Sequence, residues 1–170
     1  QMMQLAFHNF ASAAVGMCVA AALVRGIASR SAGHLGNFWT DLVRGVIYIF
    51  IPGAIVLALL FVQQGVLQNF KPYLTVGTIE GAKQVLAMGP VASQEAIKQL
   101  GTNGGGFFNA NAAHPFENPT PWTNFLQMVA IFIVPAGATY WFGRAVRHQK
   151  HGWALWAAMF VMFIGGTAVT

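Results

Sequence analysis

Four long apolar runs constrain this sequence more than any other feature. They cover residues 5–24, 45–63, 122–142 and 153–170. The first three are each about 20 residues long, which is the length an α-helix needs to cross roughly 30 Å of hydrocarbon. Only 8% of the residues are charged, whereas ordinary soluble domains have about 25%. The sequence therefore predicts an all-α membrane protein whose helices lie in the lipid bilayer.

The two ends of the sequence suggest a piece of a longer protein. Gln1 is not an initiator methionine, and the fourth apolar run is still unfinished at Thr170. We therefore expect a fragment whose last membrane helix is truncated.

Basic residues gather in two short connections between the apolar runs. Residues 25–44 and residues 144–152 together hold six of the nine basic side chains. Because basic residues favour the cytoplasmic ends of membrane helices, we expect both connections in the cytoplasm and segment 64–121 outside. The net charge of +5 then reflects topology, and no nucleic-acid partner is expected. The six basic residues are Arg25, Arg30, Arg44, Arg144, Arg147 and Lys150.

Segment 91–100 is apolar in part but too short to span a bilayer. We expect a short helix that enters and leaves the membrane on one side, with Ser93 as its N-cap, Glu95 in its first turn and Gly101 as its stop. Irregular backbone at membrane depth is tolerated only within protein or beside water. The segment therefore predicts a re-entrant pore loop over about 91–108.

The sequence GTNGGGFFNAN at 101–111 follows this short helix. Gly101 and Gly106 have the spacing of a phosphate-binding P-loop, but Phe107 and Phe108 occupy the positions of its lysine and hydroxyl. A dinucleotide fingerprint needs a preceding strand, which the pattern does not indicate. A nucleotide site is therefore not expected, and the two phenylalanines argue against a flexible linker.

A cation filter is the functional interpretation of this loop. Main-chain carbonyl oxygens can replace the water around a cation, and glycine permits the backbone conformations that aim them. The end of the helix near Leu100 would add negative potential. Thr102 offers a hydroxyl as well as a carbonyl, and Phe107 with Phe108 would pack the loop against neighbouring helices. A purely structural re-entrant turn remains the alternative.

Two further polar pairs lie near the Gly-rich loop and at the start of the first span. His114 and Glu117 could suggest a metal site, but three prolines nearby prevent the helix that would align them, which favours a rigid return to the next span. His8 and Asn9 begin the first span and either line a polar cavity or serve the structure.

Residues 101–124 closely resemble the second pore-loop signature of the potassium-binding A subunits of Kdp-type potassium-transporting ATPases; they read GTNGGGFFNANAAHPFENPTPWTN. Residues 8–14 resemble a helix start of that family, and residues 36–42 resemble its GNFW-x-DL cytoplasmic connection. The resemblance covers nearly the whole chain. Its departures lie outside the Gly-rich core, at His8, Ala112 and Trp122.

This resemblance implies potassium-channel-like repeats of helix, pore loop and helix, four in the full-length protein. Residues 1–43 would hold the end of the first repeat with a cytoplasmic connection, residues 44–143 the second repeat, and residues 144–170 a cytoplasmic turn with the truncated helix of the third. The implied filter positions are Thr102, Asn103, Gly104 and Gly105, supported by Gly101, Gly106, Phe107 and Phe108.

The resemblance also implies a role. Such a subunit sits in the bacterial inner membrane, captures external K⁺ with filter carbonyls and passes it to a P-type ATPase subunit, KdpB, beside the small subunits KdpC and KdpF. ATP hydrolysis by this chain and an organic cofactor are not expected. A channel subunit with a re-entrant loop or a secondary ion transporter is the alternative, although a transporter predicts ionisable residues in its spans.

A membrane-embedded enzyme is a further alternative, which requires a constellation of carboxylates or histidines. The acidic residues are far apart in sequence: Asp41, Glu80, Glu95 and Glu117.

Overall fold

The computed structural model describes residues 2–29, 33–108 and 110–169. Its α-helices are α1 (Met2–Ala28), α2 (Phe38–Gly45), α3 (Ile51–Gln63), α4 (Val91–Leu100), α5 (Pro121–Ala145) and α6 (Gln149–Val169). The shorter elements are a π-helical turn, η1 (Val46–Phe50), a 3-10 turn, η2 (Ala110–Ala112), and the strands β1 (Leu74–Gly77) and β2 (Lys83–Leu86). Arg30 of the first basic connection and Asn109 of the Gly-rich sequence lie outside the described residues.

Four helical segments are long and apolar enough to cross a membrane. They are Met2–Ala28, Phe38–Gln63, Pro121–Ala145 and Gln149–Val169. Each overlaps one predicted span and begins before it. Most large apolar side chains of these helices lie exposed at the surface of the isolated chain, as expected for helices whose outer faces contact lipid. The prediction of an all-helical membrane protein is confirmed.

The connection before the second span is shorter than the sequence predicts. Residues 25–44 are expected to connect the first two spans, but α1 continues to Ala28 and the chain is helical again from Phe38 onward. Asn37 explains the early start, because its side-chain oxygen accepts a hydrogen bond from the Thr40 N–H at 3.1 Å and caps α2. Apolar run length alone does not reveal this polar first turn.

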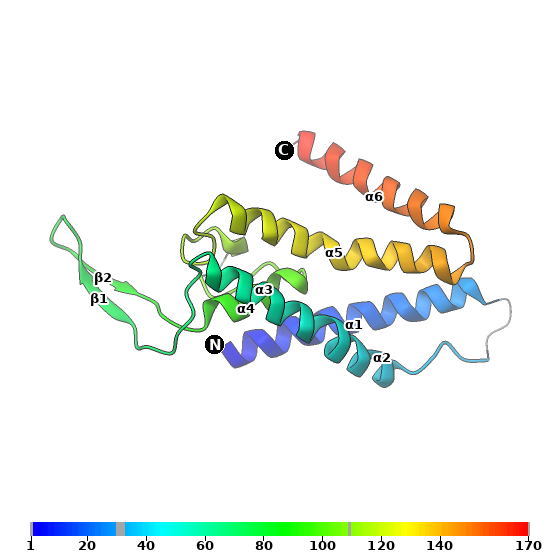
Figure 1. Ribbon diagram of the computed structural model, residues 1–170, viewed down its shortest axis with the longest axis horizontal. Coiled ribbons are helices and arrows are strands. Elements are labelled where there is room, and N and C mark those ends of the chain that lie inside the picture. The colour runs from blue at the N-terminus through cyan, green and yellow to red at the C-terminus, as the bar shows by residue number, and fades with distance from the viewer. Residues whose placement is uncertain (1, 30–32, 109, 170) are drawn as a thin grey trace.

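The two basic connections lie at one end of the helices, and the long segment between α3 and α5 lies at the other (Figure 1). At the basic end Arg25 and Asp41 form an ion pair whose second contact, Nη2 to Oδ1, is 2.8 Å long. This pair joins the end of α1 to α2. The arrangement agrees with the predicted topology, while the side that faces the cytoplasm stays a prediction.

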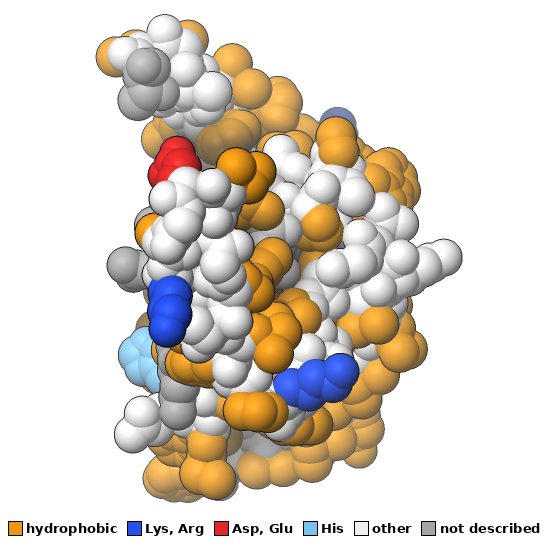
Figure 2. Space-filling model, turned by 90° about the vertical axis from the view of Figure 1, so that its left-hand side faces the viewer, with side chains coloured by type: hydrophobic (Ala, Val, Ile, Leu, Met, Phe, Trp, Pro, Cys, Tyr) orange, Lys and Arg blue, Asp and Glu red, His pale blue; other side chains and the backbone are white. Residues whose placement is uncertain are grey.

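A β-hairpin, which the sequence pattern does not predict, projects from the other end (Figure 1). β1 and β2 pair antiparallel, with Leu74 opposite Leu86 and Gly77 opposite Lys83. Nearly every residue of the two strands is exposed. Figure 2 shows this end of the molecule, where a few scattered charges lie among apolar and uncharged polar groups.

Two apolar clusters form the core, and both include residues of α4. The first joins α4 to α3 and α5 through Leu57, Phe61, Val66, Val91, Ala92, Ala96 and Ala130. The second joins α4 to α1 and α3 through Ala14, Phe50, Ala54, Ile97 and Leu100. The short helix is therefore the centre around which α1, α3 and α5 pack, whereas α6 packs on α5.

Candidate functional site

Helix α4 is buried along almost its whole length, although half of its residues are polar. Nine of its ten residues are buried, and α1, α3 and α5 all contact it. Gly53 permits the close approach of α3, because a Cβ there would lie 2.8 Å from a methyl group of Leu100. A polar helix in such surroundings needs a partner for each buried polar side chain.

The start of α4 corrects two expectations. The helix begins at Val91 after Pro90, so Ser93 is not its N-cap, and Glu95 falls beyond the first turn. The side chain of Gln68 binds the first turn of α4 instead. Its Oε1 accepts the Ser93 N–H at 3.1 Å, and its Nε2 donates to the Ser93 hydroxyl at 2.5 Å. Local sequence patterns could not place Gln68 here, since it belongs to a distant loop.

The Gly-rich loop is attached to the C-terminal end of α4 by its backbone. Gly101 is the C-cap residue. The Thr102 N–H donates to the Gln99 carbonyl at 3.1 Å, and the Asn103 N–H donates to the Lys98 carbonyl at 3.1 Å. The first residues of the loop are therefore fixed to the helix end, where the helix dipole places partial negative charge.

Left-handed residues alternate with ordinary ones in this loop. Thr102 has φ 58° and Gly104 has φ 85°, whereas Asn103 and Gly105 do not have positive φ. A β-branched residue rarely adopts positive φ, and such strained residues cluster at functional sites. A Cβ on Gly104 would also lie 2.8 Å from Oδ1 of Asn111, so this position requires glycine twice over.

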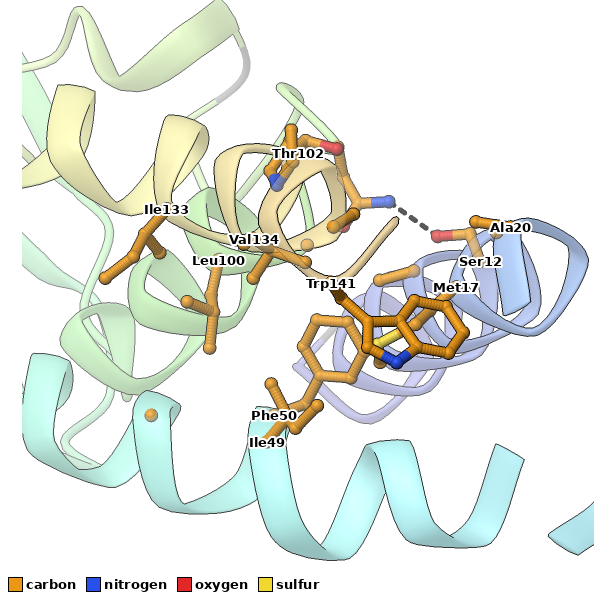
Figure 3. A pocket seen from close by; sticks show the side chains of 18 residues that line it. Ser12, Met17, Ala20, Ile49, Phe50, Leu100, Thr102, Ile133, Val134 and Trp141 are labelled. Carbon is orange, nitrogen blue, oxygen red and sulfur yellow. Dashed lines mark hydrogen bonds between the residues drawn. The ribbon is translucent and has the colours of Figure 1, made fainter. Parts of the chain in front are cut away.

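Helix α1 packs on the same loop. The Asn103 amide donates to the Ser12 hydroxyl at 2.6 Å (Figure 3). Asn9 is buried, and its carbonyl oxygen lies 3.0 Å from where a Cβ on Gly101 would be. His8, by contrast, is exposed. Of the two polar residues expected near a cavity, only Asn9 reaches the loop.

A cavity of ≈ 760 Å³ borders the loop between α1, the helix formed by η1 and α3, and α5. Its walls are mainly apolar and include Phe50 and Trp141, while Thr102, Asn103 and Ser12 supply polar groups (Figure 3). The start of the Gly-rich loop is therefore the polar rim of an otherwise apolar cavity.

Phe107 and Phe108 pack against the core cluster of α3, α4 and α5. A Cβ on Gly89 would lie 2.7 Å from the Phe107 ring. The Phe108 ring stacks on His114 with centroids 4.3 Å apart, and it meets Phe116 edge-on. Both phenylalanines therefore anchor the far end of the loop by packing against the neighbouring helices.

Three charged residues that are separate in sequence meet behind this end of the loop. Lys98 forms an ion pair with Glu95, and its Nζ lies 3.5 Å from Oε1 of Glu117. All three side chains are fully buried. Burial raises the pKa of the Glu95 carboxyl, and the neighbouring Lys98 opposes that rise.

This cluster was not predicted from the sequence. The spacing of Glu95 and Lys98 on one helix indicates a pair, but nothing local links either residue to Glu117. His114 Nδ1 accepts the Phe116 N–H at 3.1 Å, and Glu117 faces Lys98. Within the described ranges no group of three or more His, Cys, Asp or Glu residues could hold a metal ion.

Apolar helices long enough to span a membrane, arranged around a short buried helix and a Gly-rich loop, define a class: multi-pass membrane proteins. A family model described as "Potassium-transporting ATPase A subunit" (KdpA) matches residues 1–170. The chain therefore belongs to this family. Membership and the four apolar helices confirm the prediction of a multi-pass membrane protein, consistent with the bacterial inner membrane.

Curated relatives agree with this assignment. A protein of Solibacter usitatus is 59% identical over 169 residues, which are 99% of this chain and 30% of the relative. A protein of Methylorubrum extorquens is 56% identical over 170 residues, which are 100% of this chain and 30% of the relative. Both are named "Potassium-transporting ATPase potassium-binding subunit". The chain spans about 30% of the length of these relatives.

Proposed function

We propose that this chain supplies one pore loop of the K⁺ filter in an ATP-driven potassium uptake pump of the bacterial inner membrane. The observation that carries the proposal is the alternating backbone at Thr102–Gly105, directly after the C-terminal end of a buried helix. The names of the relatives assign potassium binding to those proteins, and the loop offers a means of achieving it.

The chemistry of the loop suits a dehydrated cation. Positive φ at Thr102 and Gly104 redirects the backbone at alternate residues, and such turns can gather N–H groups on one side of the backbone and carbonyl oxygens on the other. A K⁺ filter uses such rows of carbonyls in place of water. Thr102 and Gly104 are the strongest candidate ligands, because the Asn103 carbonyl already accepts the Gly105 N–H at 3.2 Å.

The remaining parts of the role lie beyond this chain. One loop cannot surround an ion, so further loops of the full-length subunit complete the filter. External K⁺ enters from the end that bears the hairpin and passes to the P-type ATPase subunit KdpB, which hydrolyses ATP beside KdpC and KdpF. Carbonyl coordination needs no organic cofactor.

The test replaces Gly104 by serine in a full-length subunit assembled with its partners. The added side chain meets both the left-handed φ and Asn111, so we expect a shifted loop. The KM for K⁺ should rise at least tenfold, which is about 1.4 kcal/mol, and discrimination against rubidium and sodium should fall. Uptake assays in whole cells measure both quantities.

Gly77→Ser is the control, because a Cβ there meets no atom within 4 Å and its φ is not positive. Gly65 also has open space around it, but it is a poorer control because its φ of +94° makes any substitution strained. A Gly104→Ser complex that assembles normally and keeps parental affinity and selectivity shows that the filter assignment is wrong.

A further inference from the structure

The far end of the Gly-rich loop is held by side chains instead of helix backbone. Gln94 Oε1 accepts the Phe107 N–H at 3.2 Å, and Glu117 Oε1 accepts the Phe108 N–H at 3.3 Å. Both acceptor side chains are fully buried. Two successive N–H groups after the glycines therefore donate hydrogen bonds to side-chain oxygens of α4 and of the segment before α5.

Lys98 holds one of these acceptors, Glu117, in place. Its Nζ pairs with Glu95 and lies 3.5 Å from the same Glu117 oxygen that accepts the Phe108 N–H. Gly106 runs directly across the cluster, since a Cβ there would lie 2.7 Å from Gln94 Oε1 and 2.8 Å from Lys98 Nζ. The backbone after the glycines thus rests on the charged group itself.

Buried charges of this kind hold their geometry strongly. Removing one partner of a buried ion pair is strongly destabilising, because the other charge is left uncompensated. The Glu117 backbone is also fixed, since Gln127 Nε2 donates to its carbonyl at 3.0 Å. Glu117 therefore cannot move away from Lys98 without a large loss of stability.

We propose that Gln94, Lys98 and Glu117 are positioning residues for ion selection, which rests on the proposed role of the loop as a K⁺ filter. A peptide group is planar, so fixing the Phe107 and Phe108 N–H groups fixes the two peptide planes after Gly106. The backbone of α4 fixes the loop upstream at Thr102. The glycines between are then clamped at both ends.

The clamp matters because glycine has the greatest backbone freedom of any residue. Carbonyls on unrestrained glycines would adapt to ions of different size. Carbonyls held from both ends keep one spacing, which favours one ion. The positioning residues act only through the backbone and do not touch the ion.

Paired substitutions in a full-length subunit with its partners test this. Gln94→Met removes the acceptor without changing any charge, and Glu117→Leu removes the other acceptor, whereas Glu117→Gln keeps an oxygen at the same place. We expect the KM for K⁺ to rise about tenfold and rubidium discrimination to fall in Gln94→Met and Glu117→Leu. Glu117→Gln should stay within about threefold of the parent, and the maximal rate per assembled complex should change less than twofold throughout.

Gln99→Met is the matched control. Gln99 is a buried α4 residue whose side chain bonds Glu95 but no loop N–H, so its loss should lower thermal stability and leave the KM for K⁺ unchanged. An equal change of KM in Gln99→Met, or parental selectivity in both Gln94→Met and Glu117→Leu, overturns the proposal. So does a failure of both to assemble, which would make the contacts a folding requirement.

The parent complex separates this inference from the proposed function. If the unmodified complex shows no K⁺-dependent uptake, the filter role fails before any variant is compared. If it does show uptake and the variants keep parental selectivity, only the positioning role is wrong.

Discussion

The β-hairpin and helix α4 belong to the same segment between two spans, and their burial is opposite to their composition. The hairpin exposes Tyr73, Val76, Ile79 and Val85. Helix α4 buries Gln94, Glu95, Lys98 and Gln99. The polar side chains of α4 are therefore buried, whereas the apolar side chains of the hairpin are exposed.

The contrast teaches that partners decide burial here, more than hydrophobicity does. Every charged side chain of α4 meets an opposite charge, and the nearby loop N–H groups end on α4 or on Glu117. The hairpin pairs only with itself in the described part of the chain. Opposite charges accompany the burial of α4, while Gln94 Nε2 and Glu117 Oε2 have no hydrogen-bond partner among the described residues. The exposed hairpin should tolerate substitution.

Access to a thiol reagent should show the largest difference between the two regions. On a Cys18→Ala background in the full-length protein, Thr78→Cys in the hairpin turn should react completely with an impermeant maleimide added outside cells. Ala96→Cys in α4 should not react, since Ala96 is fully buried.

The same labelling tests the topology. Gln149→Cys, in the second basic connection, should react only after the membrane is opened. Labelling of Gln149→Cys in intact cells would reverse the predicted orientation, and labelling of Ala96→Cys would remove the contrast.

Replacing one lysine in each region should give the second-largest difference, which is a difference in stability. Lys98→Met leaves Glu95 and Glu117 buried without a counter-charge, so we expect a loss of about 3–5 kcal/mol and little assembled complex. Lys83→Met in exposed β2 should behave like the parent. Yield and thermal unfolding of the purified complex measure this, and equal stability of the two variants would contradict it.

Added methyl groups should give a smaller difference. In Gly106→Ala the new Cβ meets Gln94 and Lys98 at under 3 Å, and overpacking of this kind costs about 1–3 kcal/mol. Gly77→Ala in β1 meets nothing within 4 Å and should unfold at the parental temperature. Gly105→Ala should also unfold normally, because its Cβ meets no atom within 4 Å.

The smallest effect should come from the hairpin itself. Ile79 is completely exposed, so Ile79→Ser should change stability by less than about 0.5 kcal/mol. Ile97→Ser in α4, which is buried, is the matched comparison and should cost several times more. A clear loss of stability in full-length Ile79→Ser would show that another part of the subunit covers the hairpin.

Local patterns predicted the helices well for a physical reason. The length of an apolar run fixes whether a helix can span a bilayer, and the turn residue Gly101 marks the end of α4 in the sequence as in the structure. The hairpin was missed because its strands have only four residues each, too few for an alternating pattern to show. Ser93 was misplaced because Pro90 starts the helix earlier than the side-chain signal suggested.

The candidate site divides in the same way. The Gly-rich loop is visible in sequence, since its residues are consecutive, and their role as a filter stays a prediction. The support behind it is tertiary: Glu117 reaches Lys98 only because the loop folds back on α4. No spacing rule connects residues that a turn of this kind brings together.

The π-helical turn η1 has a consequence for how this gene tolerates deletions. Ile51 N–H bonds to the Val46 carbonyl, which places one residue more in this turn than an α-helix uses. Removing that extra residue leaves an ordinary α-helical turn, so losing a single codon between Val46 and Phe50 would leave the two halves of the helix facing the same way. Asp41 could then keep Arg25 while Phe50 keeps its edge contact with Phe10. The same three-base deletion within the regular part of α3 would instead rotate everything beyond it by about 100°.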